Sequence, residues 1–163
     1  MYTPKIQQAR LLAQFIHYGQ KRSGGEDYFD AHIEPVALAV AEQVKGQDNF
    51  EDLVCAAYLH DSEEMSLSPK IIYDLIVEHF SSKTKHLVSI LTHHKDIMTY
   101  NDYIYYISKE PDALIIKFKD MENNTKDCNN IPHKQYMKYH DACVYLASIG
   151  IEIPEILKVR LKL

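Results

Sequence analysis

The stretch "LVCAAYLHD" (residues 53–61) predicts a helix that is apolar on nearly every face until it ends in a histidine and an aspartate. A helix that is apolar all round usually lies at the centre of a protein, covered by other elements. The predicted helix spans residues 50–64, so His60 and Asp61 lie near its C-terminal end. An ionised carboxylate beside a buried helix needs a partner, because burying the charge alone costs several kcal/mol.

Helical signals also dominate the rest of the chain. Apolar residues recur at helical spacing, and Ser68 followed by Pro69 is typical of a helix start. The predicted helices cover residues 4–18, 33–45, 50–64, 69–80, 82–92, 98–111, 112–124 and 131–150, and a short one follows Pro154. No run alternates like a strand, and residues 19–30 predict a glycine-rich loop. We therefore expect a single all-α domain over residues 1–163, a bundle of about eight helices.

The net charge limits the kinds of ligand that we expect, and the cysteine content indicates the cellular compartment of the protein. A net charge of −5 gives no global positive field for nucleic acid or an anionic membrane, so neither is an expected partner. A polyanionic ligand would need a metal ion or a local basic cluster. Cys55, Cys128 and Cys143 lack CxxC spacing and predict reduced thiols. Without an apolar leader or a membrane-spanning stretch, the sequence predicts a cytoplasmic protein, and it does not predict the number of subunits.

Further residues of the metal-ligand type lie in two other segments. His32 stands just before the predicted helix 33–45, and Asp120 follows an apolar run inside the predicted helix 112–124. Two histidines and two carboxylates make a mixed nitrogen and oxygen site that suits Mn²⁺, Fe²⁺, Zn²⁺ or Co²⁺. Neighbours do not share a face of an ideal helix, so His60 and Asp61 can bind one ion only near a helix end. For that pair alone, a capped helix end with a solvated Asp61 is the alternative.

The order of these residues resembles a known family. The segments "HYGQKRSGGEDYFDAHIEPVA" (17–37), "AAYLHDSEE" (56–64) and "IKFKDMENN" (116–124) are similar to motifs of the HD-domain hydrolases of the RelA/SpoT type. The resemblance runs in order through residues 9–124, and by length the chain is most similar to the small single-domain alarmone hydrolases. It implies an HD-domain helical bundle and a metal-dependent phosphohydrolase that removes the 3′-pyrophosphate from the nucleotides ppGpp and pppGpp.

The resemblance also implies roles for individual residues. The expected metal ion is Mn²⁺. Its ligands would be the histidines and aspartates of these motifs: His32, His60, Asp61 and Asp120. The catalytic carboxylates would be Asp61 on the metal and Glu64, which would position or deprotonate the attacking water. Contacts to the nucleotide would come from Arg22, Lys21 and Asn124. The two cations among these would supply the local positive charge that an acidic chain needs.

Several departures from the family pattern leave other functions open. Met65 stands where the family has the aspartate of a Glu-Asp pair. One extra residue separates Arg22 from His32, a change that the pair Gly24–Gly25 can absorb. One alternative is an HD phosphohydrolase of another nucleotide, such as a nucleoside phosphate or NADPH. A second is a degenerate HD module that binds a nucleotide or a protein partner without turnover, although retention of all four expected ligands argues against it.

Other titratable residues near the motifs have structural explanations. His17 is either a hydrogen-bonded histidine on the first helix or a ligand contact. Lys117 and Lys119 flank Phe118 before Asp120, and the expected place for both lysines is a solvated helix face, although one of them could approach phosphates.

Overall fold

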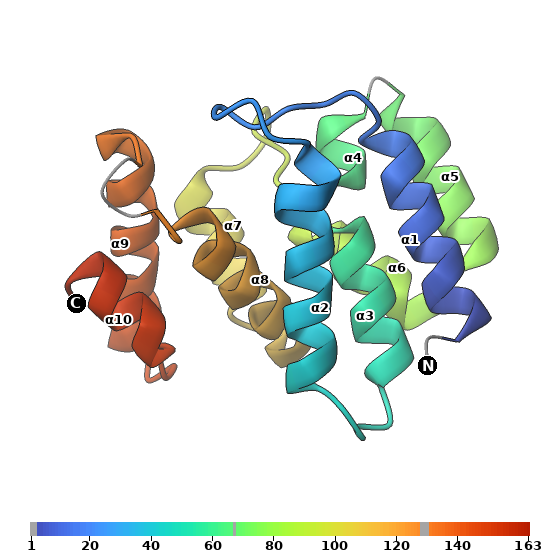
Figure 1. Ribbon diagram of the computed structural model, residues 1–163. Coiled ribbons are helices and arrows are strands. Elements are labelled where there is room, and N and C mark those ends of the chain that lie inside the picture. The colour runs from blue at the N-terminus through green and yellow to red at the C-terminus, as the bar shows by residue number, and fades with distance from the viewer. Residues whose placement is uncertain (1–2, 67, 128–130) are drawn as a thin grey trace.

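The computed structural model describes residues 3–66, 68–127 and 131–163. In these ranges the chain forms α-helices, one π-helical turn and no strand (Figure 1). In chain order the elements are α1 (Pro4–Ile16), η1 (Phe29–Ile33), α2 (Glu34–Gln43), α3 (Phe50–Leu59), α4 (Ser62–Met65), α5 (Pro69–His79), α6 (Ser82–Leu91), α7 (Tyr100–Ile107), α8 (Pro111–Asn124), α9 (His133–Ser148) and α10 (Glu155–Leu161). The prediction of an all-α fold is confirmed.

Helix α3 occupies the centre of the bundle. Every residue from Leu53 to Leu59 is buried, as its apolar character on all faces predicts. Helices α1 and α2 pack against α3 on one side, and α6 and α8 cover the rest of it. The C-terminal end of α3, which carries His60, is therefore enclosed by neighbouring helices.

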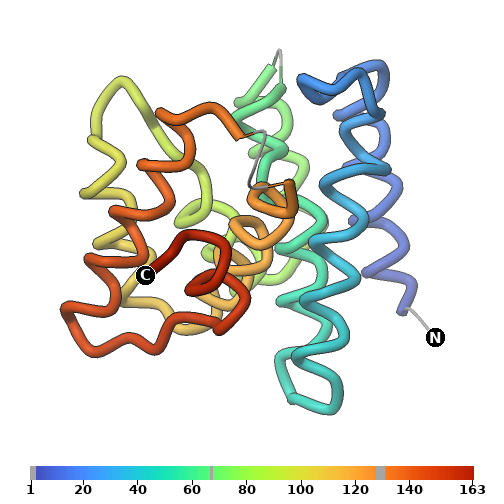
Figure 2. Tube along the Cα trace, turned by 60° about the vertical axis from the view of Figure 1, so that its left-hand side comes forward, coloured from blue at the N-terminus to red at the C-terminus, as the bar shows by residue number. Residues whose placement is uncertain are grey.

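Helices α9 and α10 lie on the far side of α8 from α2 and α3 (Figures 1 and 2). Helix α9 contacts α7, and α10 contacts both α8 and α9. Two hydrogen bonds fix α10 to its neighbours: Arg160 Nη1 donates to the carbonyl of Glu122 (2.5 Å), and the Tyr136 hydroxyl donates to the carbonyl of Leu161 (2.7 Å). The N-terminal part of α9 is thereby held beside the C-terminal half of α8.

The helix boundaries differ from the prediction at two places. The predicted helix 50–64 is two helices, because α3 ends at Leu59 and α4 begins at Ser62. The predicted helices 98–111 and 112–124 are separated differently, because α8 begins at Pro111, whose fixed φ suits the first position of a helix. The described residues contain ten α-helices, α1 to α10, one of which is the four-residue α4 that divides the predicted helix 50–64.

The cysteines in the described residues are free thiols. Cys55 and Cys143 are both buried and form no disulfide. Burial raises the pKa of Cys55 to about 12 and that of Cys143 to about 11, so both stay protonated and unreactive at neutral pH. Cys128 lies outside the described residues. In the described part of the chain, no helix has both the length and the apolar character needed to cross a membrane.

Candidate metal centre and its cleft

The helix breaks at His60 and Asp61, and the break lets two neighbouring residues face one point. His60 caps the end of α3, whereas Asp61 is the N-cap of α4 and has a φ of −101° and a ψ of 0°. Successive side chains of a continuous helix point about 100° apart. The altered backbone brings the two side chains together, with 3.4 Å between His60 Nε2 and Asp61 Oδ2. The expectation that this pair lies at a helix end is confirmed.

His32 reaches the same point from the π-helical turn η1. Its Nε2 atom lies 3.2 Å from Asp61 Oδ2, and its ring centroid lies 5.3 Å from that of His60. A π-helical turn holds more residues than an α-helical turn, and such turns often occur at functional sites. Relative to the family pattern, the chain has one extra residue between Arg22 and His32. Two features of this segment can accommodate it: the widened helical turn η1 and the glycine turn in which Gly25 has a φ of 86°.

His32, His60 and Asp61 form a cluster that could hold a metal ion. One ligand atom from each residue lies within 4.8 Å of those of the other two. Both imidazoles are buried, whereas the side chain of Asp61 is 20% exposed. Two imidazole nitrogens and a carboxylate oxygen are the donor types that divalent transition metals prefer.

The hydrogen bonds of the two imidazoles test whether a cation fits this cluster. His60 Nδ1 lies 2.8 Å from the carbonyl of Ala57, and His32 Nδ1 lies 2.9 Å from Oδ1 of Asn123. Both partners only accept, so each Nδ1 carries the proton and each Nε2 of a neutral ring presents a lone pair. These lone pairs face Asp61, and the buried Nε2 of His60 has no hydrogen-bond partner. Acceptors that face acceptors need a positive charge between them, so a metal ion fits the residues present.

Asp120, the fourth predicted ligand, lies beside the cluster but not in it. Its Oδ1 is 3.4 Å from His32 Nε2, yet Asp120 does not join the group whose ligand atoms lie within 4.8 Å of one another. Lys117 donates to Oδ2 of Asp120 (2.7 Å), and Asn124 donates to Oδ1 (2.5 Å). Both carboxylate oxygens are therefore occupied by donors from the same helix.

Two residues that support the cluster were not assigned a role from the sequence. The hydroxyl of Tyr28 donates to Oδ2 of Asp61 (2.6 Å). Asn123 accepts from His32 through Oδ1 and donates from Nδ2 to the carbonyl of Ala31 (3.3 Å). Tyr28 stands in the motif that also contains His32, so its position could have identified it. Asn123 precedes Asn124, the predicted nucleotide contact, but no sequence pattern indicated a role for Asn123 itself.

The pKa of Asp61 shifts in the direction that a metal ligand needs, whereas the pKa of His32 is raised, because burial lowers it less than the hydrogen bond and charge of Asp61 raise it. Burial raises the pKa of Asp61, but its electrostatic interactions with His60 and His32 and the hydrogen bond from Tyr28 more than reverse this effect. The pKa of Asp61 is therefore well below its ordinary value, and the residue is a carboxylate at neutral pH.

A cavity of about 320 Å³ opens beside the cluster. Its walls come from the loop after α1, from α4, from α8 and from α9 (Figure 1). All predicted substrate-side and catalytic residues line it: Lys21, Arg22, Asp61, Glu64 and Asn124. A second cavity of about 370 Å³ continues past Arg22 and Asn124, so the cleft extends well beyond the metal ligands.

Arg22 and Lys21 hold different positions on the cleft wall. Arg22 donates from Nη1 to Asn123 Oδ1 and from Nη2 to Asn124 Oδ1, each at 3.1 Å. The guanidinium is thus fixed at the boundary between the two cavities. Lys21 is exposed and pairs with Asp27 at 3.4 Å, an interaction worth little in solvent.

Glu64 and Met65 line the cleft from the short helix α4. Oε1 of Glu64 pairs with Nζ of Lys95 at 2.5 Å, and the Lys95 side chain is 68% exposed. A pair with such an exposed lysine exchanges readily with water or ligand. The Met65 side chain is 40% exposed, and Gln20 Nε2 donates to its backbone carbonyl (3.1 Å). The two side chains that stand where the family has a Glu-Asp pair both reach the cleft.

The structure places Lys117 and His17 in the protein interior, which differs from the prediction for Lys117 and agrees with one of the two predictions for His17. Lys117 is buried, with its ammonium bound to Asp120 and 5.1 Å from the ring centroid of Tyr103, so the prediction of a solvated lysine is wrong. His17 is a buried structural residue, because its Nδ1 lies 2.9 Å from Gln20 Oε1 and its ring lies 5.2 Å from that of Tyr28. Lys119 pairs with Glu122 at 2.9 Å and lies on the outer part of α8.

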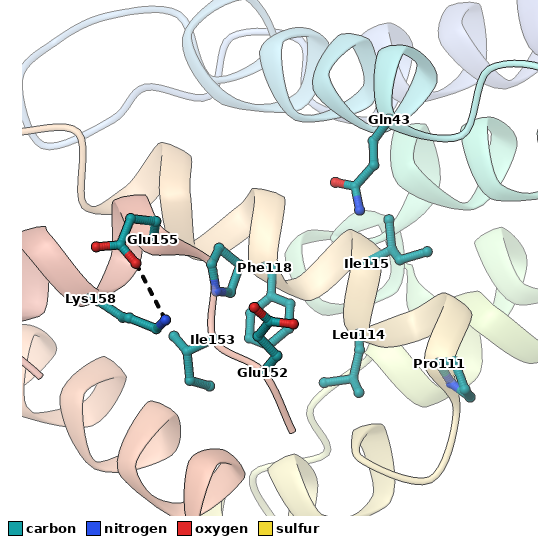
Figure 3. A pocket seen from close by; sticks show the side chains of 10 residues that line it. Gln43, Pro111, Leu114, Ile115, Phe118, Glu152, Ile153, Glu155 and Lys158 are labelled. Atoms are coloured by element: carbon teal, nitrogen blue, oxygen red, sulfur yellow. Dashed lines mark hydrogen bonds and ion pairs between the residues drawn. The ribbon is translucent and has the colours of Figure 1, made fainter. Parts of the chain in front are cut away.

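An apolar groove of about 390 Å³ lies apart from this cleft, between α8 and residues 152–158 (Figure 3). Its apolar side chains include Leu114, Phe118 and Ile153, and two of its charged residues, Glu155 and Lys158, pair with each other at 3.3 Å. None of the predicted site residues lines it. The candidate site is therefore the cleft beside His32, His60 and Asp61.

Comparison with known proteins gives a match at the level of structure. No protein-family model and no curated protein sequence matches the chain. A solved structure of a metazoan ortholog of SpoT, which hydrolyzes ppGpp and plays a role in starvation responses, matches with a TM-score of 0.76 and 19% identity. The match covers 99% of this chain and 94% of that one. The chain has the fold of that ppGpp hydrolase, the HD-domain helical bundle that the sequence resemblance implied.

Proposed function

We propose that this chain is a metal-dependent phosphohydrolase that removes the 3′-pyrophosphate from ppGpp or pppGpp, with Mn²⁺ as its metal. The observation that carries the proposal is the convergence of His32 Nε2, His60 Nε2 and the Asp61 carboxylate at the wall of a polar cleft. The likeness of the fold to a ppGpp-hydrolysing SpoT ortholog supports the choice of substrate.

The proposed reaction breaks the bond between the 3′ oxygen of the ribose and the adjoining phosphorus. Water adds its oxygen to that phosphorus, pyrophosphate leaves with it, and the ribose oxygen takes up a proton. A divalent cation held by His32, His60 and Asp61 would offset charge on the phosphoryl oxygens and lower the pKa of water at the site. No side chain forms a covalent bond to phosphorus.

Glu64 is the proposed acceptor of the proton that the attacking water loses. It lines the cleft on α4, three residues after the ligand Asp61, and its partner Lys95 is mostly exposed. A carboxylate within hydrogen-bond reach of the attacking water is the usual general base for such a step. Asp120, held by Lys117 and Asn124, is the proposed fourth ligand, and its 3.4 Å approach to His32 supports that role.

Arg22 and Asn124 are the proposed contacts to the nucleotide. They meet at the boundary between the two cavities, where a planar guanidinium can stack on a base or bind phosphate oxygens. Lys21 adds positive charge at the rim. A nucleotide that reaches both cavities is favoured over a phosphate ester that fills the metal-side cavity alone.

A direct assay tests the proposal. The purified protein with Mn²⁺ is offered ppGpp, pppGpp, NADPH and a set of nucleoside phosphates, and the products are separated by ion exchange. Release of GDP and pyrophosphate from ppGpp is the expected result. Turnover of another compound alone would establish a different phosphohydrolase.

A second candidate is a module that binds a nucleotide without turnover. It is favoured by Met65, which lines the cleft where the family has a carboxylate. Tight Mn²⁺ and ppGpp binding, with no product from any compound in the set, would establish this candidate in place of the hydrolase.

A further inference from the structure

Four cationic side chains line the cavity beside the metal ligands: Lys21, Arg22, Lys117 and Lys138. The first three have polar partners. Lys21 pairs with Asp27, Arg22 donates to the amide oxygens of Asn123 and Asn124, and Lys117 binds Asp120. Within the described ranges, Lys138 has neither a hydrogen bond nor an ion pair. Among the four, Lys138 is the cation without a direct polar partner in the described part of the chain.

Aromatic rings hold Lys138 in place at the cleft. Its Nζ lies 4.4 Å from the ring centroid of Tyr100 on α7 and 5.1 Å from that of Tyr139 on α9. Tyr139 is buried and Tyr100 is half-buried, so both rings are fixed by the packing of α7 against α9. A lysine placed over two ring faces keeps its ammonium near one point without a carboxylate partner.

The surroundings of Lys138 favour an anion as its missing partner. Burial lowers the pKa of Lys138, and the positive charge of Lys117 acts in the same direction. Lys138 is exposed to solvent, so a ligand can reach its ammonium, and a ligand of opposite charge would also relieve the repulsion between Lys138 and Lys117. Asp120 and Glu64, the acidic groups whose charges act on Lys138, line the same cavity. An anion bound to Lys138 would therefore lie next to the proposed metal ligands.

We propose that Lys138 binds the phosphoryl group of the substrate while that group is held at the metal ligands. This inference rests on the proposed function and adds a specificity residue to it. A lysine ammonium binds phosphate as a point charge from any direction, which suits a group whose oxygens are shared with a metal. Gln135, one turn earlier on the same face of α9, also lines the cavity. Helix α9 thus contributes a polar wall opposite α4.

Phosphate binding to the Mn²⁺-loaded protein tests the role of Lys138 without requiring turnover. Inorganic phosphate is titrated, and the broadening of its ³¹P resonance by protein-bound Mn²⁺ reports both affinity and closeness to the metal. Lys138→Met is expected to raise the Kd for phosphate about tenfold, the usual scale for a lost charged hydrogen bond. Lys138→Arg, which keeps the charge, is expected to restore most of the affinity.

The matched control is Lys134→Met, because Lys134 is exposed on the same helix and does not line the cavity. It is expected to bind phosphate like the parent protein. All variants should bind Mn²⁺ equally, since none changes a proposed ligand, and circular dichroism checks that α9 is intact. Equal phosphate affinity in parent and Lys138→Met, or no phosphate broadening in the parent, would overturn the role of Lys138.

The same proteins separate this inference from the proposed function. If the parent hydrolyses ppGpp, Lys138→Met is expected to raise KM. The difference in KM between the variant and the parent should become smaller in high salt, because salt screens the charge of Lys138. If the parent binds phosphate through Lys138 but hydrolyses none of the nucleotides, the proposed function is wrong and the role of Lys138 stands. If the parent hydrolyses ppGpp but Lys138→Met binds phosphate as tightly as the parent does, the proposed function stands and the role of Lys138 is wrong.

Discussion

The hydroxyl of Tyr28 donates a 2.6 Å hydrogen bond to Oδ2 of Asp61, the same oxygen that faces the Nε2 atoms of His32 and His60. Burial, together with the negative charge of Asp61, raises the pKa of Tyr28 far above its ordinary value, so the hydroxyl remains a donor. A donor on a ligand carboxylate fixes the orientation of that carboxylate before the metal arrives. Tyr28 is thus a positioning residue for the proposed metal site.

Tyr28→Phe is expected to weaken Mn²⁺ binding about tenfold, the lower end of the usual effect of removing a hydrogen bond to a metal ligand. The ring that packs between His17 and His32 remains, so the fold should be kept. Isothermal titration with Mn²⁺ measures the change. Tyr18→Phe is the control, because the Tyr18 side chain is 88% exposed. Equal Mn²⁺ affinity in Tyr28→Phe and the parent would show that Asp61 needs no such support.

Asp61→Ala is expected to abolish Mn²⁺ binding and any hydrolysis. Asp61 is the carboxylate that both imidazoles face, and without it the only remaining carboxylate of the proposed site is Asp120, whose oxygens are already held by Lys117 and Asn124. Mn²⁺ should raise the melting temperature of the parent, because a ligand that binds only the folded state stabilises it. It should leave that of Asp61→Ala unchanged. Asp48→Ala, at an exposed position, serves as the control. Full turnover by Asp61→Ala would refute the metal assignment.

Lys117→Met is expected to lower the free energy of unfolding of the metal-free protein by about 3 kcal/mol. The reason is that Asp120, whose side chain is buried, would lose its 2.7 Å ion pair with Lys117. Burial raises the pKa of Asp120, but Lys117, with smaller contributions from His32 and His60, more than reverses this, so the pKa lies below its ordinary value. A carboxyl whose pKa falls on folding stabilises the protein at neutral pH, and this contribution is lost as the pH falls.

Chemical denaturation at neutral pH and at a pH below the ordinary pKa of an aspartate measures the Lys117 effect. The double variant Lys117→Met with Asp120→Asn is the control, since it removes both charges and should recover most of the lost stability. A Lys117→Met protein as stable as the parent at neutral pH would mean that Asp120 is not held as a charged group.

The core and the metal ligands could be predicted because their signals are local. The apolar run Leu53–Leu59 predicted a buried helix, and its end predicted where His60 and Asp61 lie. The break at Asp61 was not predicted at its position, because neither glycine nor proline marks it and tertiary contacts decide it. His32 and Asp120 were identified from the order of motifs, and the structure places both near His60.

The supporting residues could not be predicted from spacing, because their roles depend on contacts between distant segments. Asn123 binds His32 across 91 positions, and an asparagine at the end of a helix is ordinary in sequence. Lys117 lies three residues before Asp120, a spacing that usually means a solvated pair on a helix surface. Its burial follows from the cover that Tyr103 on α7 provides, which no local pattern encodes.

Met65→Asp tests whether this site lacks one carboxylate that its proposed reaction uses. The Met65 side chain lines the cleft and is 40% exposed, so an aspartate there would be solvated and the fold should be unaffected. Next to Glu64, a second carboxylate would help to hold and orient the attacking water. We therefore expect kcat for ppGpp to be preserved or raised, by up to about tenfold. Mn²⁺ affinity should not change, because Met65 is not among the ligand atoms.

Met65→Asn is the matched control for this variant, because it has the shape of aspartate without the charge. Steady-state hydrolysis of ppGpp by the parent and both variants gives kcat and KM at saturating Mn²⁺. A rise in kcat for Met65→Asp alone would show that the carboxylate itself acts on the water. A lower rate with an unchanged choice of substrate would count against this role, because added negative charge would then only repel the phosphoryl oxygens.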